Sequence, residues 1–278
     1  MTSLSLDIDL DRGLAAVADT EPLVHALTND VTTNDVAQVI LHWGGLPVMS
    51  QDEREVDDMI AGAAACLLNT GTLDADSEET MTRAGAAAAE RGVPVVLDPV
   101  GAGATPTRSR VARRFATDLD PAVVKGNYGE VSALAGEDAA VRGVEAVGEY
   151  ADVAETAVAC AREFDTVVVA SGETDVVATP DAALEISAGH PLMGAVVGTG
   201  CMLGATIATF AGAVDDPGRA AVLGTVAFGL AGEAAADGTF GDYHGPASYH
   251  TAFLDAVAGL DDVAVEDPAA RVEPVLGQ

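Results

Sequence analysis

Four places in this chain pass from a short apolar run directly into polar residues, and these places carry the side chains best suited to chemistry. Asp98, Lys125 and Ser171 each stand where such a run ends, and Glu130 follows Lys125 by five residues. A fourth run ends at Asn69. In an open α/β sheet, ligands bind beyond the carboxyl ends of the strands. If these runs are strands, the polar side chains that follow them face one site.

A further candidate is the turn Gly198-Thr199-Gly200-Cys201, which leads into an apolar run long enough for about three turns of helix. The free N–H groups and positive dipole at a helix start attract anions, and glycines let a phosphate approach the main chain. The turn therefore predicts an anion hole at Gly198, Thr199 and Gly200. A thiol at Cys201 would lie at the same positive end, where the thiolate is favoured. A G-x-G sequence before a helix also occurs as a plain packing turn, so the turn alone supports both interpretations.

Taken together, these residues provide what phosphoryl transfer requires. Asp98 and Glu130 could hold Mg²⁺ directly or through waters, and Lys125 could contact a phosphate. The N–H groups of the Gly198 turn could stabilise charge on the transferred group. Lys125 has extra weight because it is the only lysine among thirteen basic residues. Each side chain also has a structural alternative: a turn cap for Asp98, a first-turn helix acid for Glu130 and a solvated surface cation for Lys125.

Several other classes of site are not supported. The sequence contains no G-x-x-x-x-G-K-[ST] phosphate loop, no early G-x-G-x-x-G dinucleotide motif and no G-x-S-x-G hydrolase elbow. The five histidines show no H-x-x-x-H spacing, and the three cysteines form no C-x-x-C pair. A histidine metal site, a zinc site and a disulfide framework are therefore not expected, and the cysteine usage fits a reducing cytosol.

The chain carries a formal net charge of −31 and has a pI near 4.1. Such a surface repels phosphate backbones and anionic lipids, so nucleic acid and membranes are not expected as partners. An excess of acids with almost no lysine is typical of halophilic adaptation to a salt-rich cytoplasm, with an ordinary acidic protein as the alternative. The N-terminal residues lack the pattern of a signal peptide, and no run of eighteen apolar residues occurs. We expect a soluble, cytoplasmic protein.

Short β-branched runs alternate with helical patterns along most of the chain. Strands are predicted at residues 47–49, 65–69, 94–98, 122–125 and 166–170, with a hairpin at 176–179 and 184–187 and no strand before residue 47. Helices are predicted at 1–20, 36–46, 53–64, 77–91, 107–116, 129–135, 149–163, from 201 onward, and at 218–236 and 247–257. This alternation is typical of an α/β fold with a mostly parallel central sheet and helices on both faces. We expect one domain over residues 1–278, with a loose acidic tail from about residue 266.

Several stretches, in this order, resemble the hydroxyethylthiazole kinase family of the ribokinase-like superfamily. The most specific are VLDPVGAGAT (96–105), GHPLM (189–193) and GTGC (198–201), and the resemblance extends from about residue 20 to about residue 260. It implies a ribokinase-like fold. It also implies transfer of the γ-phosphate of ATP, with Mg²⁺, to the primary alcohol of 4-methyl-5-(2-hydroxyethyl)thiazole in thiamine salvage.

The resemblance also implies roles for single residues. It places Cys201 beside the substrate hydroxyl, Met49 and Gly198 at the thiazole, Lys125 and Ser171 at the nucleotide, and Asp98 and Glu130 near the metal. It further implies a homotrimer with the thiazole site between subunits. Three positions depart from the family pattern: Lys125 stands where arginine is usual, Ser171 replaces threonine and Ala26 replaces asparagine. The change at Lys125 removes a two-pronged contact and could alter how phosphate is held.

Three other functions stay open at this point. A related kinase could act on another small alcohol, such as hydroxymethylpyrimidine or a sugar, which the polar segment Thr28 to Asn34 would suit. A lyase could use the same glycine loops to hold a nucleotide without transferring phosphate. A non-catalytic homologue could bind the ligand as a sensor. Stoichiometric release of ADP would separate a kinase from the last two.

Overall fold

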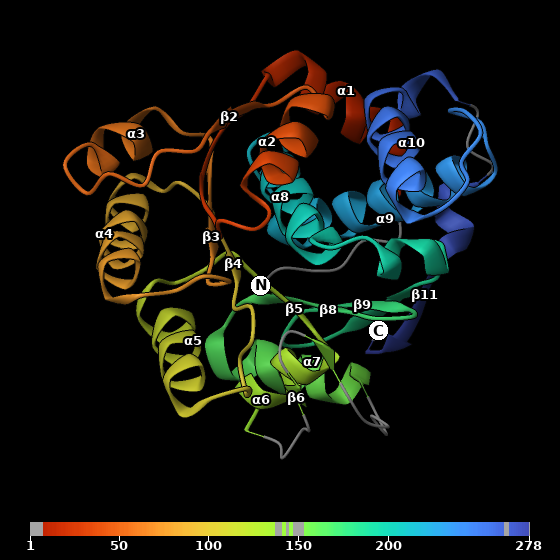
Figure 1. Ribbon diagram of the computed structural model, residues 1–278. Coiled ribbons are helices and arrows are strands. Elements are labelled where there is room, and N and C mark those ends of the chain that lie inside the picture. The colour runs from red at the N-terminus through yellow and green to blue at the C-terminus, as the bar shows by residue number, and fades with distance from the viewer. Residues whose placement is uncertain (1–7, 137–140, 143–144, 147–152, 264–266, 278) are drawn as a thin grey trace.

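The computed structural model describes residues 8–136, 141–142, 145–146, 153–263 and 267–277 (Figure 1). Its centre is a nine-stranded sheet in the order β11-β10-β9-β8-β5-β4-β3-β1-β2. Strands β2, β1, β3, β4, β5 and β8 run parallel, whereas β9, β10 and β11 extend the sheet in antiparallel fashion. The strands are β1 (Leu23–Leu27), β2 (Leu46–Val48), β3 (Ala65–Asn69), β4 (Val95–Asp98), β5 (Val123–Asn127), β8 (Val167–Ser171), β9 (Asp175–Ala178), β10 (Ala183–Ile186) and β11 (Val272–Leu276). A separate pair joins β6 (Val141–Arg142) to β7 (Glu145–Ala146).

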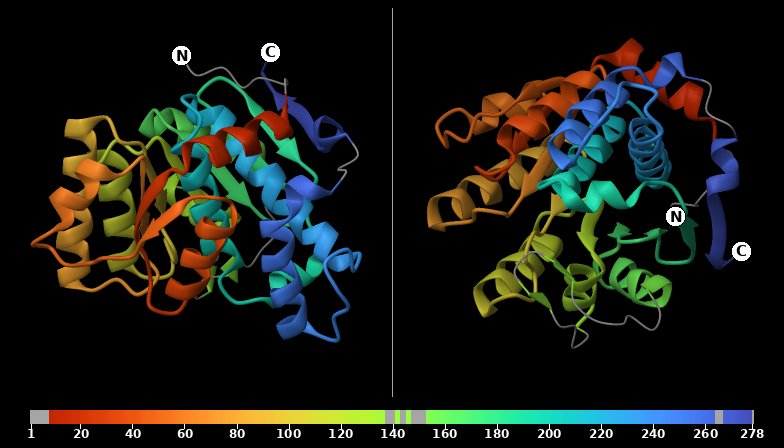
Figure 2. Two further views of the ribbon diagram at one scale, coloured as in Figure 1. Left: turned by 90° about the horizontal axis from the view of Figure 1, so that it is seen from above. Right: turned by 45° about the vertical axis from the view of Figure 1, so that its right-hand side comes forward.

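Helices cover both faces of the sheet, as the sequence predicts. One face carries α1 (Leu10–Thr20), α2 (Thr33–His42), α8 (Thr199–Ala211), α9 (Pro217–Ala236) and α10 (Pro246–Ala258). The other carries α3 (Val56–Gly62), α4 (Ala75–Arg91), α5 (Pro106–Asp118), α6 (Tyr128–Leu134) and α7 (Val153–Phe164). Figure 2 shows the same three layers from two further directions. Short 3-10 turns lie at η1 (Pro191–Ala195), η2 (Leu260–Asp262) and η3 (Pro268–Arg271).

The sheet strands are apolar on both sides because each side has a core of its own. In β4, Val96 packs into the core beneath α8 and α9, whereas Val95 and Leu97 pack into the core of the opposite face. Burial on both faces is the reason that these runs lack the alternation of a half-exposed strand. The carboxyl ends of β3, β4 and β5 lie next to one another at one edge because these neighbouring strands pair in parallel.

Strand β1 is absent from the sequence prediction. Leu23–Leu27 forms β1, between β2 and β3, in a segment that the sequence analysis assigned to no strand. The polar residue His25 is the reason that this strand was not predicted. In the structure His25 is fully buried, and its Nε2 lies 2.8 Å from the carbonyl oxygen of Ser50. A polar side chain with a long-range hydrogen bond is compatible with a buried strand, but nothing in the local sequence reveals that bond.

The prediction of a loose tail from residue 266 is wrong for the part that the structure describes. Val272–Leu276 forms β11, which pairs antiparallel with β10 at the edge of the sheet and buries Val272. The strand was not predicted because it contains Pro274 and neighbouring acidic residues, which are uncommon in strands. An edge strand tolerates proline because its outer side needs no N–H donor. The predicted helix segments at 1–7 and 149–152 lie outside the described residues.

In the described part of the chain, no helix has both the length and the apolar composition needed to cross a membrane.

Candidate active site

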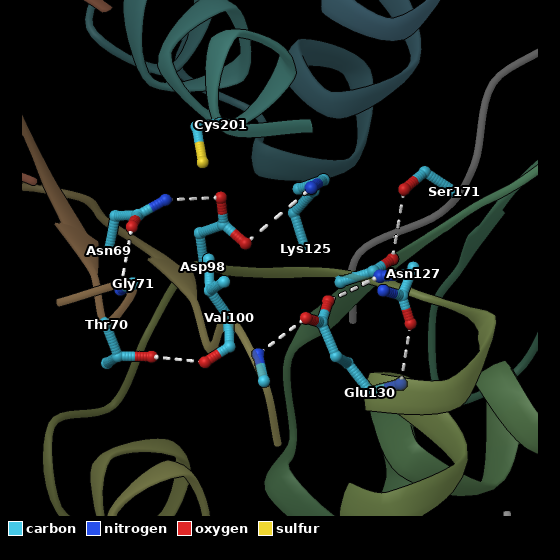
Figure 3. Close-up of polar contacts among 12 residues, drawn as sticks. Asn69, Thr70, Gly71, Asp98, Val100, Lys125, Asn127, Glu130, Ser171 and Cys201 are labelled. Carbon is cyan, nitrogen blue, oxygen red and sulfur yellow. Dashed lines mark hydrogen bonds and ion pairs between the residues drawn. The ribbon is translucent and has the colours of Figure 1, made fainter. Parts of the chain in front are cut away.

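The polar residues that end the strands meet at one edge of the sheet (Figure 3). Asn69 of β3 is the register partner of Asp98 of β4, and Asn127 of β5 is the partner of Ser171 of β8. Helix α8 begins above them, with Cys201 in its first turn. The edge is the position at which open α/β sheets bind ligands.

Asp98 and Lys125 form a buried ion pair. Asp98 is fully buried and Lys125 is 3% exposed, and 3.6 Å separates Asp98 Oδ1 from Lys125 Nζ. Burial lowers the pKa of Lys125, but the carboxylates of Asp98 and Glu130 raise it, and the net pKa lies above the ordinary value. The lysine is therefore a buried ammonium ion, not the solvated surface cation of the alternative interpretation.

Glu130 ties together the loops that follow β4 and β5. Its Oε1 accepts the N–H of Gly101 at 2.7 Å, and its Oε2 accepts the N–H of Asn127 at 2.8 Å. Asn127 in turn caps α6 by accepting the N–H of Glu130 at 2.9 Å. Burial, with a further contribution from the Asp98 carboxylate, raises the pKa of Glu130 to about 7. The side chain thus shapes the edge of the site through two backbone hydrogen bonds.

These acids are compatible with Mg²⁺ only if other ligands supply most of its coordination. Among the described residues, no group of three or more His, Cys, Asp and Glu side chains lies close enough to enclose a metal. Asp98 Oδ1 is buried and has no hydrogen-bond partner in the described part of the chain, which leaves a carboxylate oxygen directed at the site. Mg²⁺ commonly binds one or two carboxylates and completes its shell with waters and substrate phosphates. Asp98 and Glu130 fit that mode.

The start of α8 presents main-chain N–H groups at the same place. Gly198 has φ +90°, and a Cβ there would lie 2.5 Å from Thr32 Cγ2, so glycine is required on both counts. A Cβ on Gly200 would lie 3.1 Å from Lys125 Nζ, which puts the ammonium group against the first turn of the helix. Thr199 Oγ1 donates to the carbonyl oxygens of Met193 and Val196 at 2.7 and 2.8 Å. Lys125 Nζ therefore lies beside the backbone N–H groups at the start of α8.

Cys201 is half-buried, and its thiol has a pKa above the ordinary value. Asn29 Nδ2 lies 3.4 Å from its Sγ. Burial and the nearby Asp98 carboxylate raise the pKa of the thiol, and Lys125 counters them only in part. The expectation of a favoured thiolate at this helix start is therefore wrong, because burial and the Asp98 carboxylate raise the pKa of the thiol by more than Lys125 lowers it.

A cavity of about 320 Å³ lies between these groups. Its lining includes Asn29, Thr32, Asp98, Lys125, Glu130, Ser171, Gly198, Gly200 and Cys201. A larger cleft of about 680 Å³ is lined by residues that include Ser171, Asp175, His190, Met193, Thr199, Gly200 and Phe228. Ser171 and Gly200 belong to both linings, so the two spaces adjoin at the start of α8.

The structure thus brings together most of the residues that the sequence singled out. Asp98, Lys125, Glu130, Ser171, Gly198, Gly200 and Cys201 line the smaller cavity, and Thr199 lines the adjoining cleft. Met49 does not line either space. It is half-buried just after β2 and packs against the core.

Sequence reasoning placed Asn69 at a strand end and Asn29 and Thr32 in a polar segment, but it assigned none of them a specific contact. Asn29 Nδ2 donates to Thr32 Oγ1 at 2.8 Å and to Asn69 Oδ1 at 2.9 Å, across forty residues of chain in the second case. The signal for Asn69 was its strand end, and the signal for the other two was the density of polar residues between β1 and α2, which exceeds what a helix cap requires.

Comparison with known proteins agrees with this arrangement. A model of the hydroxyethylthiazole kinase family matches residues 14–262. The chain is 61% identical to hydroxyethylthiazole kinase of Natronomonas pharaonis over 99% of both chains. It is 60% identical to that of Haloquadratum walsbyi, covering 95% of this chain and 93% of the other.

Solved structures show the same relationship. Hydroxyethylthiazole kinase protein from Pyrococcus horikoshii superposes with a TM-score of 0.82 at 34% identity, covering 96% of this chain and 98% of the other. Pyridoxal kinase from Staphylococcus aureus has a TM-score of 0.52 at 13% identity, covering 73% of this chain and 85% of the other. At that identity the second match establishes a shared kinase fold alone.

Proposed function

The chain belongs to the hydroxyethylthiazole kinase family, and we propose that it transfers the γ-phosphoryl group of ATP to the primary hydroxyl of 4-methyl-5-(2-hydroxyethyl)thiazole. The observation that carries the proposal is the junction of the two spaces at Ser171 and Gly200. A cavity of about 320 Å³ suits a small alcohol, and the cleft of about 680 Å³ suits a nucleotide. The adjoining of the two spaces supports a reaction at the start of α8.

The groups at the junction suit the charge that develops during transfer. The alcohol oxygen forms a bond to the γ-phosphorus and releases its proton to water, while the bond from that phosphorus to the leaving oxygen of ADP breaks. Charge on the transferred group is met by the N–H groups of Gly198 to Cys201 and by Lys125 Nζ. Bound Mg²⁺, with Asp98 and Glu130 on its side of the site, would neutralise the phosphate oxygens.

Cys201 lies beside the alcohol in this arrangement and acts through position. A loose transition state needs little removal of the hydroxyl proton before the new bond forms. A neutral thiol that accepts from Asn29 and contacts the hydroxyl can therefore orient the oxygen without serving as a strong base. Met49 and Gly198 are proposed to contact the thiazole ring.

We also propose that the enzyme works as a cytoplasmic homotrimer, in which a neighbouring subunit closes the alcohol cavity. Val31 and Val197 both line that cavity and are 68% and 73% exposed. Large apolar side chains this exposed at the rim of a site favour a covering partner. Met49 lies outside the cavity of its own chain, which is compatible with a contact across such an interface. Sedimentation velocity in molar KCl would give three times the mass of one chain, and a monomer with full activity would contradict the trimer.

The deciding experiment measures ADP release from Mg²⁺-ATP in molar KCl with hydroxyethylthiazole, with hydroxymethylpyrimidine and with no acceptor. We expect turnover that depends on the thiazole alcohol, with phosphorylated thiazole formed one-to-one with ADP. Turnover with hydroxymethylpyrimidine but not with the thiazole would show that the substrate is another alcohol. No acceptor-dependent turnover would refute a kinase.

A further inference from the structure

Asn69 is the central member of the polar network around the alcohol cavity, although it does not line that cavity (Figure 3). It is the last residue of β3 and is 1% exposed. Its Nδ2 donates to Asp98 Oδ2 at 2.7 Å, and its Oδ1 accepts from Gly71 N at 3.1 Å and from Asn29 Nδ2 at 2.9 Å. A backbone N–H can only donate, so Oδ1 must face Gly71 and Nδ2 must face Asp98.

This amide sets the orientation of the Asp98 carboxylate. Asn69 holds Oδ2, and no other hydrogen bond from the described residues reaches either oxygen. Oδ1 consequently points at Lys125 Nζ and toward the cavity. Asn69 and Lys125 thus hold the two oxygens of the carboxylate, and Oδ1, which accepts no hydrogen bond from the described residues, can still take an incoming ligand.

The same amide reaches the alcohol side of the site. The donor to its Oδ1 is Asn29 Nδ2, which also lies 3.4 Å from Cys201 Sγ and 2.8 Å from Thr32 Oγ1. Asn69 therefore stands between the phosphate side, at Asp98 and Lys125, and the alcohol side, at Asn29 and Cys201.

We propose that Asn69 is a positioning residue for phosphoryl transfer, whose side-chain amide fixes the Asp98 carboxylate on one side and the Asn29–Cys201 contact on the other. The proposal rests on the proposed kinase function. It assigns Asn69 an effect on the transfer step, with little effect on the binding of either substrate.

Asn69→Asp isolates the donor to Asp98, because it keeps the size of the side chain and both acceptor contacts of Oδ1. It removes the N–H donor and sets a second carboxyl group against Asp98. Two carboxyl groups this close either repel each other or share one proton, and both outcomes change the contact that fixes Asp98. Asn69→Ala removes the amide without adding charge, and it is the test variant if Asn69→Asp does not fold.

The matched control is Thr70→Val. Thr70 is the next residue and is 4% exposed, and its Oγ1 donates to Val100 O at 3.3 Å between the same two loops.

We expect kcat of each Asn69 variant to fall by about 10- to 100-fold, as for other residues that orient a functional carboxylate. The KM values for ATP and for the alcohol should stay within about threefold, and kcat of Thr70→Val should stay near wild type at a similar loss of melting temperature. A folded Asn69 variant with wild-type kcat would overturn the proposal. So would a kcat loss no larger than that of Thr70→Val.

A crystal structure of Asn69→Ala supplies a readout that does not depend on turnover. The Asp98 carboxylate should rotate away from its wild-type plane, and an unchanged Asp98 would also overturn the proposal. If wild-type protein releases no ADP with hydroxyethylthiazole, the proposed function fails by itself, and the orientation of Asp98 still tests the role of Asn69.

Discussion

The buried charge of Lys125 is the residue-level feature on which the site depends most. Its ammonium ion lies against Asp98, the first turn of α8 and the floor of the cavity, in a chain that otherwise uses arginine. Buried ion pairs stabilise little in net terms, but loss of one partner leaves a desolvated charge that is costly. We therefore expect loss of Lys125 to lower both the stability of the fold and the rate of turnover.

Lys125→Met should lower the free energy of unfolding by about 3–5 kcal/mol, because Asp98 is left buried and unpaired. Urea denaturation in molar KCl measures this change. Arg54→Met is the control, because Arg54 pairs with Asp52 at the surface and has 84% of its side chain exposed. This substitution should leave the denaturation midpoint unchanged. Equal midpoints for the two variants would show that Lys125 is not a buried cation.

The protonation state of Cys201 is testable by its alkylation with iodoacetamide, since the thiolate is the reacting form. Burial and Asp98 raise the pKa of this thiol above its ordinary value of 9.0, so the rate should be low at neutral pH and should still rise above pH 9. Cys66 and Cys160 are fully buried, with pKa values raised by burial to about 12, and should stay unlabelled. Cys201→Ser is the control. A half-maximal rate below neutral pH would indicate the thiolate instead.

At the scale of elements, the start of α8 depends on local backbone geometry, whereas the edge strand β11 depends on a distant strand. Gly198 combines a left-handed backbone conformation with the close approach of Thr32. Strand β11 depends instead on pairing with β10 across more than eighty residues of chain.

Gly198→Ala should cost about 1–3 kcal/mol in stability from backbone strain alone. It should also lower kcat by about 100-fold, because the anion hole is displaced from the reacting phosphate. Gly62→Ala is the control, as a Cβ there meets nothing within 4 Å. A Gly198→Ala variant with normal kcat would remove this turn from the transfer step.

Truncation after Arg271 tests the contribution of β11. Loss of residues 272–278 leaves β10 as an open edge, and we expect the melting temperature to fall by about 4 °C or more and aggregation to increase. The truncated chain keeps the ion pair of Arg271 with Glu233, 2.7 Å apart, so that pair does not account for the change. An unchanged melting temperature and no light scattering would restore the interpretation of a loose tail.

At the scale of the whole molecule, the net charge of −31 determines the conditions under which the fold is stable. The Debye length shrinks from about 10 Å at 0.1 M salt to about 3 Å at 1 M, which screens repulsion between neighbouring carboxylates. The melting temperature should rise steadily from 0.1 M to 3 M KCl. NaCl should act similarly if screening is the cause, and a flat or falling profile would contradict halophilic adaptation.

The sequence by itself determined the α/β architecture and the edge at which chemistry occurs. Strand β3 at residues 65–69 has the predicted bounds, and Asp98 and Ser171 end their strands as expected. The prediction was wrong for Lys125, which lies inside β5, two residues before that strand ends at Asn127. This succeeded because a short apolar run between helices is a local signal, and because the ends of parallel strands must share one edge of the sheet.

The tertiary structure alone decided which atoms of that edge act together. Strands β1 and β11 form through pairing with distant strands, and Asn69 gains its role from partners 29 and 40 residues away. The neutral state of Cys201 is likewise a result of burial and of Asp98, more than a hundred residues earlier. Desolvation and long-range hydrogen bonds depend on neighbours in space, which a local pattern of residues does not contain.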